Sequence, residues 1–232
     1  MKNGFALGAL AVLGVVGAAS AEPVRSVRPA GQGSHTYNGT RTETIADQPW
    51  DGISYGYVAQ DFSDFPSFSS YQFDDVVFSK DYYVETLFAP GSEFGFSGAN
   101  TDVIGQIWSD LPDKGGVLLA EGHGTQVGSD LVIDFGGAQV NAGSHWITAW
   151  VERSFGAGGQ WFWLSTTPVT GSEEYFYNPG GGFGFGTASI PGSVVFGVAH
   201  DMAFTLTGTP VPAPGAAALL GLGGLVALRR RR

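Results

Sequence analysis

The stretch Asp130-Leu-Val-Ile-Asp-Phe135 places a large apolar residue at every second position, with aspartates and a valine between them. Successive side chains of a β-strand point to opposite faces, so this period of two predicts a strand with one face in the core. The stretch Asp201-Met-Ala-Phe-Thr-Leu206 has the same period. Both stretches therefore predict strands of a β protein with a buried face.

Further short runs of β-branched and aromatic residues are separated by Gly, Pro, Asp, Asn and Ser, which is typical of strands joined by turns. They predict strands at Phe73 to Ser79, Tyr82 to Ala89, Val103 to Ser109, Val117 to Glu121, His145 to Glu152, Trp161 to Thr166 and Val194 to Ala199. Three glycine-rich segments predict loops or turns: Gly122 to Gly128, Phe155 to Gly159 and Asn178 to Gly186.

No amphipathic helix competes with these strands. The pattern predicts an all-β fold with a single antiparallel β-sandwich, and the most specific expectation is a jelly roll. An N-terminal signal helix and a C-terminal apolar helix are expected to flank it. We divide the 232 residues into a signal peptide (1–21), a polar arm (22–50), the β-sandwich ectodomain (51–209) and a tail (210–232).

Composition limits the function classes. The chain has no Cys, so an exported domain cannot rely on disulfides and needs its core, or bound ions, for stability. Of 11 basic residues, Lys2 and Arg229 to Arg232 lie in the two ends, which leaves 6 against 21 acidic residues and a net charge of −15. Nucleic acid is thereby excluded as a partner, because phosphate binding needs a basic patch.

Both ends of the chain indicate export. An early Lys2, an apolar run and the small residues Ala19 and Ala21 predict a secretory signal that is cleaved after Ala21. At the other end, a proline-rich break precedes the apolar run Ala216 to Leu228 and the arginines Arg229, Arg230, Arg231 and Arg232. The apolar run is at or below the roughly 18 to 20 residues that span a bilayer, and the arginines should remain on the cytoplasmic side.

The tail Val211-Pro-Ala-Pro-Gly215, with its apolar run and arginines, resembles the PEP-CTERM sorting signal of bacterial envelope and biofilm proteins. The resemblance implies that an exosortase-type membrane protease cuts near Pro212, Ala213 and Pro214, after transient anchoring in the inner membrane. Ala213 stands where the family motif has Glu. The alternative for this tail is a plain membrane anchor without processing.

The central region also resembles uncharacterised sandwich ectodomains found ahead of such tails. The segments that carry this likeness are Phe73-Asp74-Asp75, the glycine-rich stretch Phe94 to Asn100, Ile107-Trp108-Ser109-Asp110 and Gly143-Ser144-His145-Trp146. The resemblance implies the fold and the location, cell surface or extracellular matrix, and no chemistry.

Four tryptophans fall in two neighbouring predicted strands: Trp146, Trp150, Trp161 and Trp163. In each strand the two tryptophans share a face, and the opposite face is apolar as well. If the tryptophan face is the outer one, it offers a platform on which sugar rings can stack. The alternative is that these tryptophans fill the core, with their indole N–H groups bonded to backbone carbonyls.

Aspartates gather at Asp61, Asp64, Asp74 and Asp75. Carboxylate oxygens are the ligands that Ca²⁺ prefers, so a calcium site is one interpretation and solvated turn carboxylates are the other. Enzyme motifs are absent: the chain has no G-x-S-x-G, H-E-x-x-H or P-loop sequence and no Cys nucleophile. A glycoside hydrolase needs two suitably spaced carboxylates, for which Glu85, Glu121 and Glu152 are the first candidates.

These observations predict a non-enzymatic exported protein with a structural or adhesive role at the cell surface or in the extracellular matrix. A carbohydrate-binding module for exopolysaccharide is the alternative, and a glycoside hydrolase is a third, weaker one.

Overall fold

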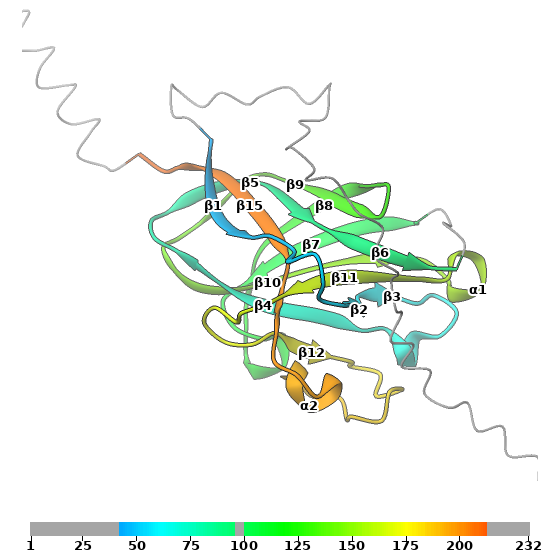
Figure 1. Ribbon diagram of the computed structural model, residues 1–232. Helices are drawn as coiled ribbons and strands as arrows, with labels where there is room; N and C mark the ends of the chain where they lie inside the picture. Colours follow the sequence, from blue (N-terminus) through cyan, green and yellow to red (C-terminus); the bar gives the residue numbers. More distant parts are fainter. Residues whose placement is uncertain (1–41, 96–99, 213–232) are drawn as a thin grey trace, which may run out of the picture.

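The computed structural model describes residues 42–95 and 100–212, and most of them lie in β-strands (Figure 1). The all-β expectation is confirmed. The predicted signal peptide lies outside the described residues, as does the tail beyond Pro212.

The larger sheet is antiparallel apart from one short parallel pair, and it curls. Its strands, in spatial order, are β1 (Glu43–Gln48), β15 (Phe204–Pro210), β5 (Tyr82–Ala89), β9 (Asp130–Val140), β8 (Leu118–Val127), β7 (Asp102–Trp108), β10 (Gly143–Glu152), β4 (Tyr71–Phe78), β12 (Tyr175–Tyr177) and β13 (Ile190–Pro191). The short strand β3 (Gln60–Asp61) runs parallel to the end of β10.

The smaller sheet is built around β11 (Gln160–Thr166). This strand pairs with β14 (Asp201–Met202), β2 (Gly56–Val58) and β6 (Gly91–Phe94). Four short helical turns complete the described chain: η1 (Pro66–Phe68), η2 (Pro112–Lys114), α1 (Phe155–Gly158) and α2 (Gly192–Phe196).

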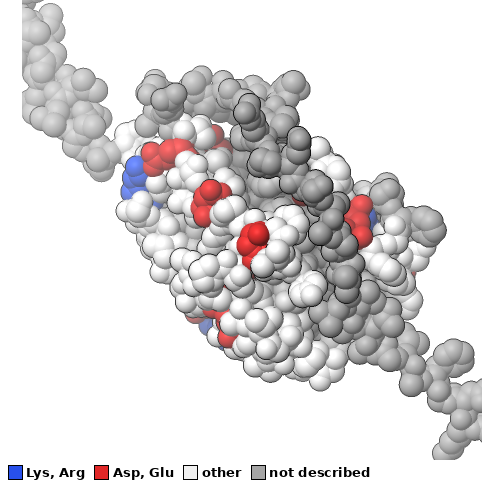
Figure 2. Space-filling model, viewed as in Figure 1, with Lys and Arg blue, Asp and Glu red and all other residues white. Residues whose placement is uncertain are grey.

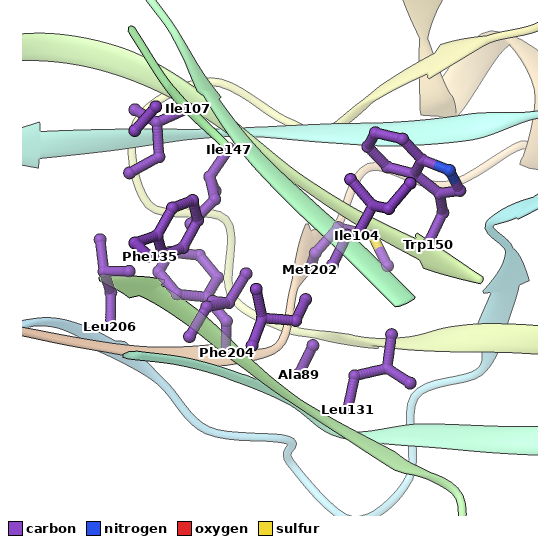
Figure 3. Packing of buried hydrophobic residues seen from close by; sticks show 14 of the residues in the cluster. Ala89, Ile104, Ile107, Leu131, Phe135, Ile147, Trp150, Met202, Phe204 and Leu206 are labelled. Carbon is purple, nitrogen blue, oxygen red and sulfur yellow. The ribbon is translucent and has the colours of Figure 1, made fainter. Parts of the chain in front are cut away.

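Both sheets contribute to one hydrophobic core. In the larger sheet, Ile107 and Ile147 are cross-strand partners and lie side by side in the packed interior (Figure 3). From the smaller sheet, β11 inserts Trp161 and Trp163, both 0% exposed. Their indole N–H groups donate to the carbonyls of Ser129 at 2.7 Å and Ala203 at 2.6 Å, so the burial leaves no donor unpaired.

The strand predictions are confirmed for most elements, and Tyr82 to Ala89 coincides with β5. The prediction for Val194 to Ala199 is wrong, because this segment begins inside helix α2. The Glu173 carboxylate accepts hydrogen bonds from the backbone N–H and hydroxyl of Ser193, and Gly197 ends the helix in the left-handed region at φ 79°. A long-range contact thus overrides a local sequence that favours strand.

Two glycine-rich segments also differ from expectation. Phe155 to Gly159 forms a helical turn whose first residues are capped by Ser154. The run Gly122 to Gly128, predicted as a turn, is mostly strand β8. A Cβ at Gly124 would lie 2.1 Å from the Val132 carbonyl oxygen, so glycine serves here for close strand approach.

Strand β1 lies within the segment that the sequence assigned to the polar arm. It pairs with β15 from Glu43 to Gln48, with a register shift between Thr44 and Ala46, and adds a strand to the larger sheet. Ile45 and Ala46 pack against the core. The β domain therefore begins before residue 51.

Candidate functional site

Strand β10 separates the core from the outer face of the larger sheet. Ile147, Ala149 and Val151 are fully buried in the core. The alternate residues Trp146, Thr148 and Trp150 consequently point to the opposite face. The sequence predicted this division of β10. The tryptophan side faces away from Ile147, Ala149 and Val151 and is only partly open, because Trp146 is half-buried whereas Thr148 and Trp150 are 0% and 7% exposed.

Strand pairing gathers further aromatic side chains on this outer face. On one side of β10, Trp108 of β7 is the direct partner of Trp146. On the other side, the Tyr71 ring of β4 meets the Trp150 ring edge-on, with centroids 5.1 Å apart and planes at 85°. Next to β4, Tyr177 of β12 is the cross-strand partner of Tyr71.

Between these rings lies an open groove with a volume of about 300 Å³. It is lined by five aromatic residues, two prolines and one amide: Tyr71, Phe73, Trp108, Trp150, Tyr177, Pro112, Pro179 and Gln106. We call this feature the aromatic groove. Flat aromatic rings in the wall of a groove can stack against the C–H faces of sugar rings.

The aromatic groove has few polar atoms, and hydrogen bonds orient the amide of Gln106 among them. Gln106 accepts a hydrogen bond from Trp108 Nε1 at 2.8 Å and donates to Glu121 at 2.6 Å, which fixes the orientation of its amide. Trp150 is 7% exposed, and its Nε1 has no hydrogen-bond partner. The buried Thr148 hydroxyl on the same face is also unpaired. Because an unpaired buried polar group is costly, a water molecule or a ligand oxygen that reached these two atoms would stabilise them.

Acidic side chains border the aromatic groove at one end. His123 Nδ1 lies 2.9 Å from Asp102, and its Nε2 lies 3.7 Å from Glu121. The hydrogen bond with Asp102 raises the pKa of His123. Burial, together with the carboxylates of Asp61 and Asp102, raises the pKa of Glu152.

The four predicted tryptophans do not form one site. Trp150 lies in the aromatic groove, and Trp146 lies on the same face, where its ring meets the Tyr175 ring at 5.3 Å. Trp161 and Trp163 are core residues, so they cannot contact a glycan and we remove them from the candidate site. Both indole N–H groups donate to backbone carbonyls, as the alternative interpretation of the sequence predicted.

Sequence reasoning missed several lining residues, among them Tyr71, Trp108 and Tyr177. Trp108 could have been included, because it belongs to the predicted strand Val103 to Ser109. Tyr71 and Tyr177 had none, because they reach the groove only through the pairing of β4 with β10 and of β12 with β4.

The four aspartates of the predicted calcium site are each engaged in internal hydrogen bonds. Asp61 accepts from Ser69, and Asp64 accepts from the backbone N–H groups of Phe155 and Gly156 at the start of α1. Asp74 and Asp75 follow each other in β4 and therefore point to opposite faces. Within residues 42–95 and 100–212, no three His, Asp or Glu side chains are grouped to hold a metal ion.

Of the three candidate glutamates, Glu121 and Glu152 lie near the aromatic groove and Glu85 does not. Glu85 lies on β5 and accepts hydrogen bonds from Thr42 and Thr209. Strand β5 is three strands from β7 and four from β10 in the sheet. Glu121 and Glu152 lie on the outer face next to the aromatic groove. The structure therefore keeps these two as neighbours of the candidate site.

A second polar cluster lies in the interior and is closed to ligands. Glu174 is 0% exposed, and its Oε1 lies 3.1 Å from Nε2 of the buried His200. This distance suits an ion pair, but burial raises the pKa of Glu174 to about 10 and lowers that of His200 to about 4. Both groups are therefore neutral at pH 7, and the Tyr57 ring stacks on His200 at 4.0 Å.

No protein-family model matches this chain, and no curated protein matches it either. Among the described residues, no helix is long and apolar enough to cross a membrane. The candidate site therefore depends on its own geometry.

Proposed function

We propose that this protein is an exported adhesive component of the cell surface or extracellular matrix, and that its β domain binds carbohydrate through the aromatic groove. The observation that carries the proposal is the groove itself, with its aromatic walls and the unpaired indole N–H of Trp150. Pockets for small ligands combine apolar walls with a few positioned polar groups in this way.

The location in this proposal depends on the two ends of the chain. A cleaved signal after Ala21 brings the domain outside, and the PEP-CTERM-like tail delivers it to an exosortase-type protease. The strong excess of acidic residues agrees with a solvent-exposed, exported domain. Exopolysaccharide is the ligand that such a location makes available. We further propose that the two sheets form a sandwich of the jelly-roll type, in which the groove occupies the outer face of the larger sheet.

A polysaccharide pull-down tests the binding. We expect the secreted domain to be retained on immobilised matrix polysaccharide, and Trp108→Ala and Tyr177→Ala to reduce the affinity by about tenfold each, because stacking aromatics dominate contact energies. Both side chains are half-buried, so they can be truncated without opening the core. Trp150→Ala is less informative, since Trp150 also packs in the core cluster.

Tyr55→Ala is the matched control, because the Tyr55 side chain is exposed on a loop and does not line the groove. Its retention should equal that of the wild type. If the wild type is not retained, or if all variants are retained equally, the aromatic groove is not a glycan site.

A glycoside hydrolase is a second candidate, and the position of Glu121 and Glu152 beside the groove favours it. Glu152 has the raised pKa that a general acid needs. Release of reducing sugar from matrix polysaccharide, abolished by Glu152→Gln, would replace simple binding by hydrolysis.

A further inference from the structure

Three carboxylates form a row across the strands that end beside the aromatic groove. Glu152 of β10 is the direct cross-strand partner of Asp102 of β7 and also the partner of Asp61 of β3. Partners in register point to the same face of a sheet, so the three carboxylates are on the outer face. Asp61 interacts with the Tyr71 hydroxyl, and Tyr71 lines the groove. We call Asp61, Glu152 and Asp102 the acidic row.

The acidic row has little positive charge to balance it. Its single basic neighbour is His123, which pairs with Asp102 and also approaches Glu121. Lys80, Lys114 and Arg153 are the Lys and Arg residues of the described part of the chain, and each is engaged elsewhere.

The positions of these three residues confirm the imbalance. Arg153 is buried and pairs with Glu93 at 2.9 Å, and Lys80 pairs with Glu43. Lys114 lies over the Tyr175 ring, 4.4 Å from its centroid. Figure 2 shows a similar distribution on one face of the molecule, where acidic side chains are spread over the surface and Lys and Arg appear at its margins.

Like charges placed opposite each other on one face of a sheet destabilise it. A row of this kind is therefore a cost to the fold that a bound cation removes. The aromatic walls beside it add to the attraction, because ring faces attract ammonium groups. The Trp150 Nε1 in the groove wall has no partner within the protein. It is a donor, so it suits an acceptor oxygen of the sugar rather than the ammonium group.

Building on the proposed function, we propose that the aromatic groove prefers glycans that carry free, protonated amino groups, and that the acidic row receives the ammonium. Uronic-acid polymers are disfavoured by the same charges. N-acetylated glycans retain the stacking on Tyr71, Trp108 and Tyr177 but lose the ionic contact, so they bind more weakly.

The test compares two oligosaccharides of equal length and linkage, a glucosamine hexamer and an N-acetylglucosamine hexamer, in mildly acidic, low-salt buffer. Using calorimetry on the secreted domain, we expect the wild type to bind the free amine about tenfold more tightly, which corresponds to ~1.4 kcal/mol. The preference should decrease as salt shortens the Debye length from about 30 Å to about 8 Å. Glu152→Gln should reduce it severalfold.

Glu85→Gln is the matched control, because it removes the same charge from β5 and leaves the acidic row intact. Equal affinity for the two hexamers, with both losing affinity in Trp108→Ala, would overturn the amine preference and leave carbohydrate binding standing. Binding of neither hexamer nor any other tested glycan would overturn both proposals. A preference lowered equally by Glu152→Gln and Glu85→Gln would show that net charge acts at a distance and would overturn the role of the acidic row.

Discussion

Glu174 and His200 show how burial alone sets the charge of a side chain. Both are inaccessible to water, and neither can keep a charge at neutral pH because no solvent compensates for it. Gly192 makes this arrangement possible, since a Cβ there would lie 1.7 Å from Glu174 Oε1. Gly192, the first residue of α2, therefore lies directly against the Glu174 carboxyl group.

This arrangement predicts a loss of stability at alkaline pH. The pKa of Glu174 is raised from 4.5 to about 10, so the folded state keeps a proton that the unfolded state releases over this range. The stabilisation therefore falls as pH rises, by up to ~1.4 kcal/mol per pH unit. The pKa of His200 is lowered from 6.5 to about 4 in the folded state, so this residue changes the free energy of unfolding only below about pH 6.5. It therefore does not alter the loss of stability expected at alkaline pH.

Denaturant unfolding at about pH 7 and about pH 9 measures the effect. We expect the free energy of unfolding of the wild type to decrease over this interval, and that of Glu174→Gln to decrease less, since glutamine keeps the shape and has no proton to lose. Parallel decreases in the two proteins would contradict the neutral state of Glu174. Glu85→Gln controls for the change in net charge.

At the scale of an element, the position of strand β8 depends on a glycine that allows close contact with its neighbour β9. Its glycines allow β8 to approach β9, where a Cβ at Gly124 would lie 2.1 Å from the Val132 carbonyl oxygen. The obstacle is backbone rather than a movable side chain. Gly124 therefore fixes the separation of two strands that hold Leu131 and Ile133 in the core.

We expect Gly124→Ala to lower the free energy of unfolding by about 1–3 kcal/mol, because the added methyl group forces the two strands apart. Thr125→Ala, at the next and exposed position of β8, should change it by less than about 0.5 kcal/mol. Thermal or chemical unfolding of the two variants checks this. Equal stabilities would mean that β8 moves away from β9 at no cost.

At the scale of the whole molecule, charge rather than a bound metal is expected to govern the response to ions. Acidic residues far outnumber the three Lys and Arg residues in the described part of the chain, and repulsion among them destabilises the compact state. Salt screens this repulsion. The four aspartates considered for calcium are engaged in separate hydrogen bonds.

Adding salt from about 0.01 M to about 0.15 M ionic strength should therefore raise Tm. At matched ionic strength, calcium chloride and sodium chloride should give the same increase, and a chelator should have no effect of its own. A larger Tm in calcium would restore a calcium site.

The location of the strands could be predicted because period two and turn residues are local properties. The residues of β5, β7, β10 and β11 were predicted closely for this reason. The helix α2 and the strand β1 could not be predicted, because the first depends on Glu173 and the second on pairing with β15. Roughly half of the predicted tryptophan site was retained, Trp146 and Trp150 on one face, and its other aromatic members came from strands distant in sequence.

The sequence by itself determined that this is a β protein, where most of its strands lie, and that each tryptophan pair shares one face of its strand. Only the tertiary structure decided which of those faces is buried. The physical reason is that alternation divides a strand into two sides without saying what covers either side. Trp161 and Trp163 of β11 are completely buried in the core, whereas the second face of β10 borders the aromatic groove, in whose wall Trp150 is largely buried.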